Sequence, residues 1–422
     1  FLTGWDTLHP EFNFSEYFNR ILNGAWQTHQ GLGAVNTQAH ASEIPRIVIL
    51  YIISLLFKLS DIRYIYAFLM LITGPLGVYY FTKQVLLKNL NPNSKELGSF
   101  LAGLFYLLNL GTLQHFYVPL EMFLTHYALL GWSFLYATKA YQEPNKKNYL
   151  SFIFVSILIT SQAHTPTLFY TYFLAKILYF FGLSIDLKFK KIKQNIKRSF
   201  LVLLTIFLIN SFWILPSLYF LVTKSAEIKE SKIHHLFSNE AFLANASFGY
   251  LKDISIIKGF LFDWGEYTGD NSFGPLLDEW ILHFDTYNLQ FLGYLFFIFS
   301  ILGLFYCAIK KNKPALGLFF VTFVSMVFLL SINPPFGFII NFLLQKLPLI
   351  KEILRFPFTK FSVFLMFTYA VFFGAFFAYV TNKIKNKKAL IISHFFIVTF
   401  LFSLLVFYML PAFKGNLIST SM

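Results

Sequence analysis

Charged residues are scarce in this chain, and long segments contain none. Asp, Glu, Lys and Arg make up 13% of the 422 residues and hydrophobic residues 56%, whereas about a quarter of an ordinary soluble domain is charged. The segment from Phe200 to Val222 has no acid and no base, and about 20 such residues form a helix that crosses about 30 Å of hydrocarbon. The shortage of charge excludes a soluble domain and predicts an integral membrane protein.

Two further absences limit the function. Cys307 is the single cysteine, which excludes an internal disulfide framework. The sequence has no P-loop, GxGxxG, GxSxG or HExxH motif, and this argues against chemistry on soluble nucleotides.

The chain also begins without Met or a signal segment. We therefore expect that a first helix precedes it and that residues 411–422 begin a truncated external region.

Ten apolar runs predict an all-α fold, a polytopic bundle of transmembrane helices. Barrel strands of about ten alternating residues would not give continuous Leu, Phe and Ile runs. The ten runs are 64–82, 98–114, 120–138, 149–163, 166–184, 199–222, 288–309, 314–332, 359–381 and 389–410. The run 44–57 is short for a span, so we expect an interfacial or re-entrant helix there. The alternative is that it spans the membrane, which would move residues 1–43 to the cytoplasm.

Lysine clusters indicate the orientation of the bundle. The net charge of +14 lies in short clusters between apolar runs rather than along one helix face, so we expect no nucleic-acid partner. Alternate loops hold most of the basic residues and, among the acids, only Glu96, Glu143 and Asp186. These loops are expected to face the cytoplasm.

The other loops then lie outside, and three of them are long enough to build a site. They are residues 1–63, 223–287 and 333–358. The expected organisation is a first external loop 1–63, the first half of the bundle 64–222, a large external loop 223–287, the second half 288–410 and the C-terminal region 411–422.

The first external loop begins with a carboxylate beside aromatic residues, in the sequence Gly-Trp-Asp-Thr that contains Asp6. A carboxylate at the external end of a membrane helix is suited to remove a proton from a sugar hydroxyl. Asp6 is therefore a candidate catalytic base. The alternative is that Asp6 caps a short helix.

Other candidate contacts lie in the two later loops. Asp263, Trp264 and Glu266 alternate acids with an aromatic ring, which suits carbohydrate, although an interfacial aromatic belt has the same composition. Arg355 and Lys360 lie at the entry to a late span and could hold a lipid phosphate; ordinary snorkelling is the alternative.

Histidines are frequent on the external side. His164 stands at a helix-to-turn junction and is a candidate substrate contact, with local hydrogen bonding as the alternative. A divalent cation is conceivable, but no HxxxH or Cys-containing ligand spacing supports one.

These features resemble the GT-C superfamily of polytopic membrane glycosyltransferases. The resemblance is carried by Gly4 to Thr7, by Asn36 to Gln38 and by Arg355 to Lys360. The first loop is similar to that of cell-wall α-(1→3)-arabinofuranosyltransferases and YfhO-type membrane proteins.

The resemblance implies an inverting transfer from a polyprenyl-phosphate sugar to an external glycan, lipid or protein acceptor. It places the protein in a bacterial or archaeal cell membrane, with an extracytoplasmic active face and Asp6 as base. GT-C enzymes often have paired acids, whereas Asp6 has no acidic neighbour. Glu11 or the acids of residues 263–279 would then be the partner.

Two other functions remain open. A lipid or glycan flippase would carry ionisable residues inside its spans, and only Lys176 and His126 lie clearly within the expected ones. A non-catalytic membrane scaffold would have the same apolar helices.

Overall fold

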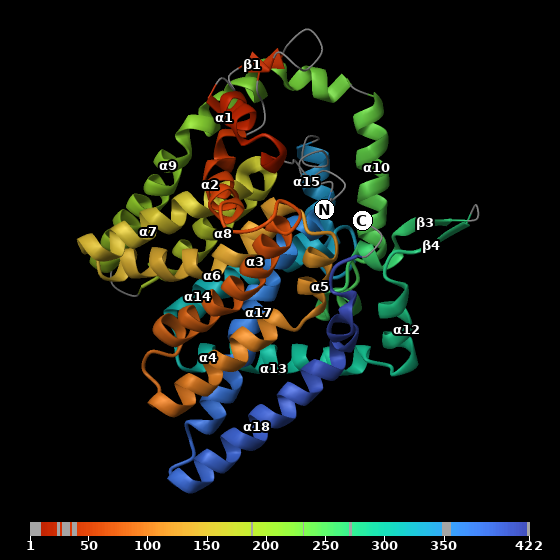
Figure 1. The fold of residues 1–422 in the computed structure, drawn as a ribbon. Coiled ribbons are helices and arrows are strands. Elements are labelled where there is room, and N and C mark those ends of the chain that lie inside the picture. Colours follow the sequence, from red (N-terminus) through yellow and green to blue (C-terminus); the bar gives the residue numbers. More distant parts are fainter. Residues whose placement is uncertain are drawn as a thin grey trace.

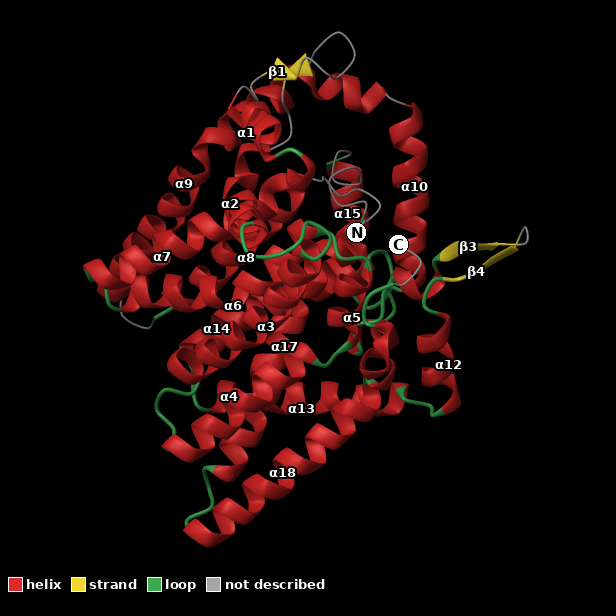
Figure 2. Ribbon diagram, in the orientation of Figure 1, coloured by secondary structure: helices red, strands yellow, loops and turns green. Residues whose placement is uncertain are grey.

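The computed structural model describes residues 10–22, 26–27, 34–35, 40–186, 189–230, 232–269, 272–347 and 356–419. Helices dominate the described chain (Figure 1). Its strands form two short antiparallel hairpins at the edge of the molecule, which Figure 2 shows in yellow. The predicted helical bundle is confirmed, and the hairpins are small additions to it.

Short elements precede the first spanning helix. They are η1 (Pro10–Phe12), α1 (Phe14–Leu22), β1 (Trp26–Gln27), β2 (Ala34–Val35), η2 (His40–Glu43) and α2 (Ile44–Ser54). Tyr17 and Ile21 on the apolar face of α1 pack with Ile47 of α2. The 11 residues of α2 are too few to cross about 30 Å of hydrocarbon.

The longer helices form the bundle. Its first half contains α3 (Ile62–Phe81) with the π-helical turn η3 (Thr82–Leu86), α4 (Pro92–Leu107), α5 (Leu110–Tyr117), α6 (Glu121–Gln142), α7 (Lys146–Leu158), η4 (Ile159–His164), α8 (Pro166–Ser184) and α9 (Phe189–Glu230). Asn91, Asn109 and Asn145 accept first-turn N–H groups at the starts of α4, α5 and α7. These caps satisfy backbone donors that have no partner inside the helix.

A mixed segment joins the two halves. It contains α10 (Lys232–Ser247), α11 (Leu251–Ser255), η5 (Phe260–Asp263), β3 (Gly265–Gly269), β4 (Ser272–Pro275) and α12 (Asp278–Thr286). The second half contains α13 (Gln290–Ile309), α14 (Lys313–Leu330), α15 (Gly337–Lys346), α17 (Pro357–Thr381), α18 (Lys387–Tyr408) and the π-helical turn η6 (Ala412–Asn416).

Within the described residues, seven helices are long and apolar enough to cross a membrane. They are α3 with η3, α8, α9, α13, α14, α17 and α18. An eighth span results if α4 and α5, which meet at 44°, count as one. The expected runs 120–138 and 149–163 correspond to α6 and α7, which lie outside this set, so a total of ten spans stays a prediction.

Helix α17 is the axis of the bundle (Figure 1). In the most apolar 18-residue stretch of α17, 89% of the residues are buried. The corresponding share in α18, at the periphery, is 17%. It packs against α4, α13 and α14. Close approach depends on two glycines: a Cβ at Gly303 of α13 would lie 1.8 Å from the carbonyl oxygen of Phe372, and one at Gly374 would lie 2.0 Å from that of Gly98.

We predict that Gly303→Ala destabilises the bundle, because the added methyl group must push α13 away from α17. Overpacking of this kind costs about 1–3 kcal/mol. The control is Gly265→Ala in β3, where the nearest atom is 3.9 Å from the new Cβ. Thermal unfolding in detergent measures both variants, and equal midpoints would contradict the close-packing explanation.

Candidate functional site

Five charged side chains meet in the interior at one end of the bundle, and we call them the charge cluster. Glu11 belongs to η1, Glu43 ends η2, Arg46 is in the first turn of α2, Arg63 is in the first turn of α3 and Glu121 begins α6. Each residue is at most 7% exposed. The charges therefore have to be balanced by one another rather than by water.

Arg63 connects the first segment of the chain to the bundle. Its Nε donates to Oε1 of Glu11, and its Nη2 lies 3.5 Å from Oε2 of the same carboxylate. Its Nη1 forms an ion pair with Glu121. The planar guanidinium can serve two carboxylates at once because its five N–H groups point in different directions.

Arg46 makes the corresponding connection from α2. Its Nε and Nη2 contact Glu43, and its Nη1 lies 3.6 Å from Oε1 of Glu121. Its backbone N–H donates to Oγ of Ser161 at 3.2 Å, which joins the start of α2 to η4. Within the described chain Nη1 has no hydrogen-bond partner, and a buried water would satisfy it.

His164 lies beside the charge cluster, with its Nδ1 3.9 Å from Oε1 of Glu43. Burial and, next, the positive charge of Arg46 lower the pKa of His164 to about 4, although Glu121 opposes this shift. Burial also raises the pKa of Glu43, against the effect of Arg46. Three carboxylates face two guanidinium groups, so protonation of Glu43 would make the cluster neutral.

A second polar group lies deeper in the bundle. Nδ1 of His126 in α6 hydrogen-bonds to Oε1 of Gln162 in η4. Nζ of Lys176 in α8 lies 3.7 Å from the ring centre of Phe134 and 5.3 Å from that of Tyr172. Ring electrons stabilise a cation in this position. Nζ has no hydrogen-bond partner among the described residues, which is unusual for an ionisable group at this depth.

The structure brings together only some of the predicted site residues. Asp6 and Arg355 lie outside the described residues. Glu11 belongs to the charge cluster and His164 lies next to it. Lys360 is buried in the first turn of α17, where its Nζ donates to the carbonyl oxygen of Phe356 at 3.1 Å.

The acids and tryptophan of residues 263–266 form a separate group. Asp263 at the end of η5 is exposed, whereas Trp264 between η5 and β3 and Glu266 in β3 are half-buried. Figure 1 shows the β3–β4 hairpin on the opposite side of the molecule from α1 and α2. The structure therefore does not bring these residues to the charge cluster.

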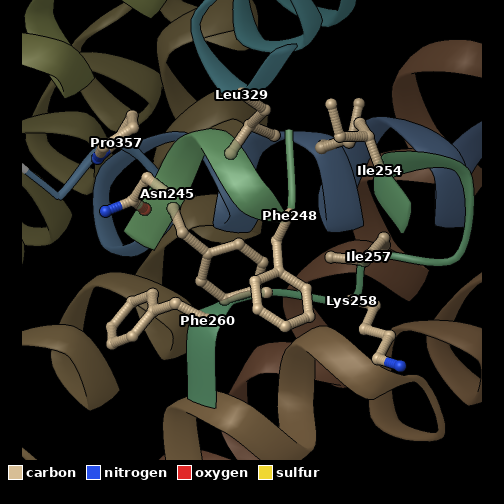
Figure 3. A pocket seen from close by; sticks show the side chains of 11 residues that line it. Asn245, Phe248, Ile254, Ile257, Lys258, Phe260, Leu329 and Pro357 are labelled. Carbon is tan, nitrogen blue, oxygen red and sulfur yellow. The ribbon is translucent and has the colours of Figure 1, made fainter. Parts of the chain in front are cut away.

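A small cavity lies between the residues before this hairpin and the start of α17. Phe248, Phe260 and Pro357 line it, and the amino group of Lys258 points away from it (Figure 3). Its volume of about 10 Å³ has room for about one water molecule. A sugar ring does not fit the cavity in this conformation.

Within the described ranges, no three His, Cys, Asp or Glu side chains converge so that they could hold a metal ion. The divalent cation that the histidines made conceivable stays untested.

The sequence did not single out Glu43, Arg46, Arg63 or Glu121 as site residues. The sequence does contain a pattern that could have indicated the cluster. Arg63 and Glu121 lie at the expected external ends of the runs 64–82 and 120–138. Two opposite charges at the same end of neighbouring helices are candidates for an ion pair. Their pairing also depends on α3 packing against α6, which periodicity does not reveal.

Comparisons with protein-family models, with curated proteins and with solved structures returned no match. The resemblance to the GT-C superfamily therefore rests on the quoted motifs and the expected topology.

Loss of the bridging arginine is predicted to destabilise the protein strongly. Arg63→Gln removes the guanidinium that pairs with both Glu11 and Glu121, and breaking a buried ion pair in this way costs about 3–5 kcal/mol. Arg20→Gln, the same change on an exposed side chain of α1, should change stability by less than about 0.5 kcal/mol. Thermal unfolding in detergent compares the two, and similar small shifts would show that the cluster does not hold the first segment.

The low pKa of His164 predicts a loss of stability in acid. Its folded pKa of about 4 lies below the value near 6.5 of an exposed imidazole, so the unfolded chain binds the proton first as the pH falls. The contribution is complete above about pH 6.5 and is lost as the pH falls toward 4. His164→Gln should flatten the wild-type decline in unfolding temperature over this range; an unchanged slope would assign the decline to other groups.

Proposed function

We propose that this chain is the membrane domain of a GT-C-type glycosyltransferase, which transfers a sugar from a polyprenyl-phosphate donor to an external glycan, lipid or protein acceptor with inversion. The observation that carries the proposal is the Glu11–Arg63–Glu121 connection. It fixes the first external segment to the bundle end at which Lys360 begins α17. An acid-bearing segment and a cationic helix start are thus on the same side of the expected membrane.

The base in this proposal is Asp6. Asp6 lies five positions before Glu11, and an extended chain of five residues spans at most about 18 Å. The anchor at Glu11 therefore restricts the positions that Asp6 can occupy. Glu11 itself is a positioning residue, because its carboxylate is already bound by Arg63.

The donor phosphate would be neutralised at the start of α17. Lys360 in the first turn of α17 and Arg355, which precedes that helix in the sequence, would supply the two positive charges. As Asp6 removes the acceptor proton, the acceptor oxygen attacks the anomeric carbon and the polyprenyl phosphate leaves on the opposite face. Asp263, Trp264 and Glu266, at the end of η5 and the start of β3, would contact an extended acceptor rather than the reacting atoms.

A flippase is the second candidate, and Lys176 favours it. This lysine is fully buried in the spanning helix α8, and His126 of α6 and Gln162 of η4 are also fully buried. Ionisable residues at such depth often mark a path through the membrane. No sugar transfer from any donor, together with lipid translocation that depends on Lys176, would favour this reading.

The transfer proposal predicts that Asp6→Asn abolishes activity. Membranes containing the protein are incubated with radiolabelled polyprenyl-phosphate sugars, and transfer to endogenous acceptors is measured. Because general-base catalysis contributes about 10²–10⁴-fold, the rate should fall at least about 100-fold while the unfolding temperature stays unchanged.

The matched control is Asp61→Asn. Asp61 is an exposed acid just before α3, on the same expected face, and its variant should keep a rate within about twofold of wild type. Equal rates in wild type and Asp6→Asn would show that another acid is the base. If wild type transfers no sugar from any donor, the proposal that the protein is an enzyme is wrong.

A further inference from the structure

A large cavity lies at the opposite end of the bundle from the charge cluster. Its volume is about 570 Å³, within the range of about 300–1,000 Å³ that is usual for ligand sites. Its walls come from the end of η3, the end of α6, the turn between α13 and α14, and the residues that follow α17. We call it the lysine cavity.

Five of the residues that line this cavity are lysines, and none of the described lining residues is acidic. The lysines are Lys88, Lys310, Lys311, Lys313 and Lys383. Lys313 forms an ion pair with Asp186, and Nζ of Lys383 lies 3.4 Å from the hydroxyl of Tyr306. Even with Lys313 balanced, the cavity keeps a strong positive potential, because the lysines surround a common space.

The wall between α13 and α14 is held in place by hydrogen bonds. Asn312 caps α14, where its Oδ1 accepts the N–H of Ala315 at 3.2 Å. Its Nδ2 donates to the carbonyl oxygen of Leu86 at 2.8 Å. The first turn of α14 therefore faces the cavity with the positive end of its helix dipole, and the turn that carries Lys310 and Lys311 is fixed to η3.

The length of the spanning helix α3 with η3 shows at which level of the membrane the cavity lies. Helix α3 with η3 has 25 residues and so is about 37 Å long, with Arg63 of the charge cluster at one end and the cavity at the other. The cavity thus lies where spanning helices end, on the face that the lysine clusters mark as cytoplasmic. Lipid headgroups occupy this level.

We propose that the lysine cavity binds the phosphate-bearing headgroup of an anionic membrane lipid. Several lysines suit a phosphate, and basic pockets between helices on the cytoplasmic side bind such headgroups. Val85, Leu86 and Pro314 in its lining offer apolar surface to the glycerol and the first acyl carbons. A lipid fits this position better than a free anion because the cavity adjoins the ends of spanning helices. The inference does not depend on the proposed function, which concerns the other end.

The test compares two triple variants with the same change in charge. Lys310, Lys311 and Lys383 are changed to Gln in the first, and the exposed Lys385, Lys387 and Lys388, which do not line the cavity, in the second. Native mass spectrometry in neutral detergent measures the binding of dioctanoyl phosphatidylglycerol. We expect at least tenfold weaker binding in the first variant and less than threefold weaker binding in the second.

Two soluble probes identify the source of the phosphate. Dioctanoyl phosphatidylcholine should bind wild type at least tenfold more weakly than the anionic lipid, and glycerol 1-phosphate should not displace the anionic lipid at equal concentration. An equal loss of phosphatidylglycerol binding in both triple variants would show that general surface charge, and not this cavity, binds the lipid. Full displacement of phosphatidylglycerol by glycerol 1-phosphate or by inorganic phosphate would show that the cavity binds a free anion rather than a lipid.

A measurement on the wild-type protein keeps the proposal testable if the first variant does not fold. Acetic anhydride labels exposed lysines, and mass spectrometry reports each one. Saturating phosphatidylglycerol should lower the labelling of Lys310, Lys311 and Lys383 at least threefold and leave Lys385 and Lys387 unchanged. Uniform protection, or none, would overturn the inference.

Discussion

Hydrocarbon offers no hydrogen bonds, and this constraint organises the rest of the structure. Each backbone N–H and C=O in the membrane must find its partner within the same helix, so the apolar runs fold as helices and charge collects at their ends. Helices α3 and α6 show the consequence most clearly. Each begins at the charge cluster, with Arg63 and Glu121, and each leads to the lysine cavity, with Leu86 and Gln142. The two charged ends face opposite sides of the same bundle.

The charge cluster is a costly way to attach a segment to a membrane domain, because desolvation of five charges offsets most of their attraction. Its value lies in specificity. Glu11 and Glu43 come from segments that no spanning helix contains, and each finds its own arginine. Arg46 and Arg63 then share Glu121. A register error in any one segment would leave a buried charge unpaired, so the cluster favours a single arrangement of this end of the bundle.

Helix α17 runs through the bundle toward the lysine cavity. Its first turn holds Lys360, its middle is packed against α13 at Gly303, and Asn382 and Lys383 follow its last turn into the lysine cavity. Stacked and edge-to-face rings surround it, among them Phe105 with Phe373 at 4.7 Å. Such contacts substitute for the hydrophobic effect, which does not drive association between helices inside lipid.

Several properties could be predicted from residues alone. The uncharged run from Phe200 to Val222 predicted a spanning helix, and it lies within α9. These predictions succeed because membrane insertion depends on local composition. The number of spans was harder to predict, since α6, with His126 and Lys139 among its 22 residues, is a long helix at the margin of the apolar range.

The sequence by itself determined that this is a helical membrane protein with charge concentrated in the loops, because solvation by lipid acts on each segment separately. Only the tertiary structure decided which charges meet. Glu11 and Arg63 are 52 positions apart, and Lys88 and Lys383 line one cavity from distant parts of the chain. Electrostatic partnership depends on distances of a few ångströms between side chains, and helix packing sets those distances.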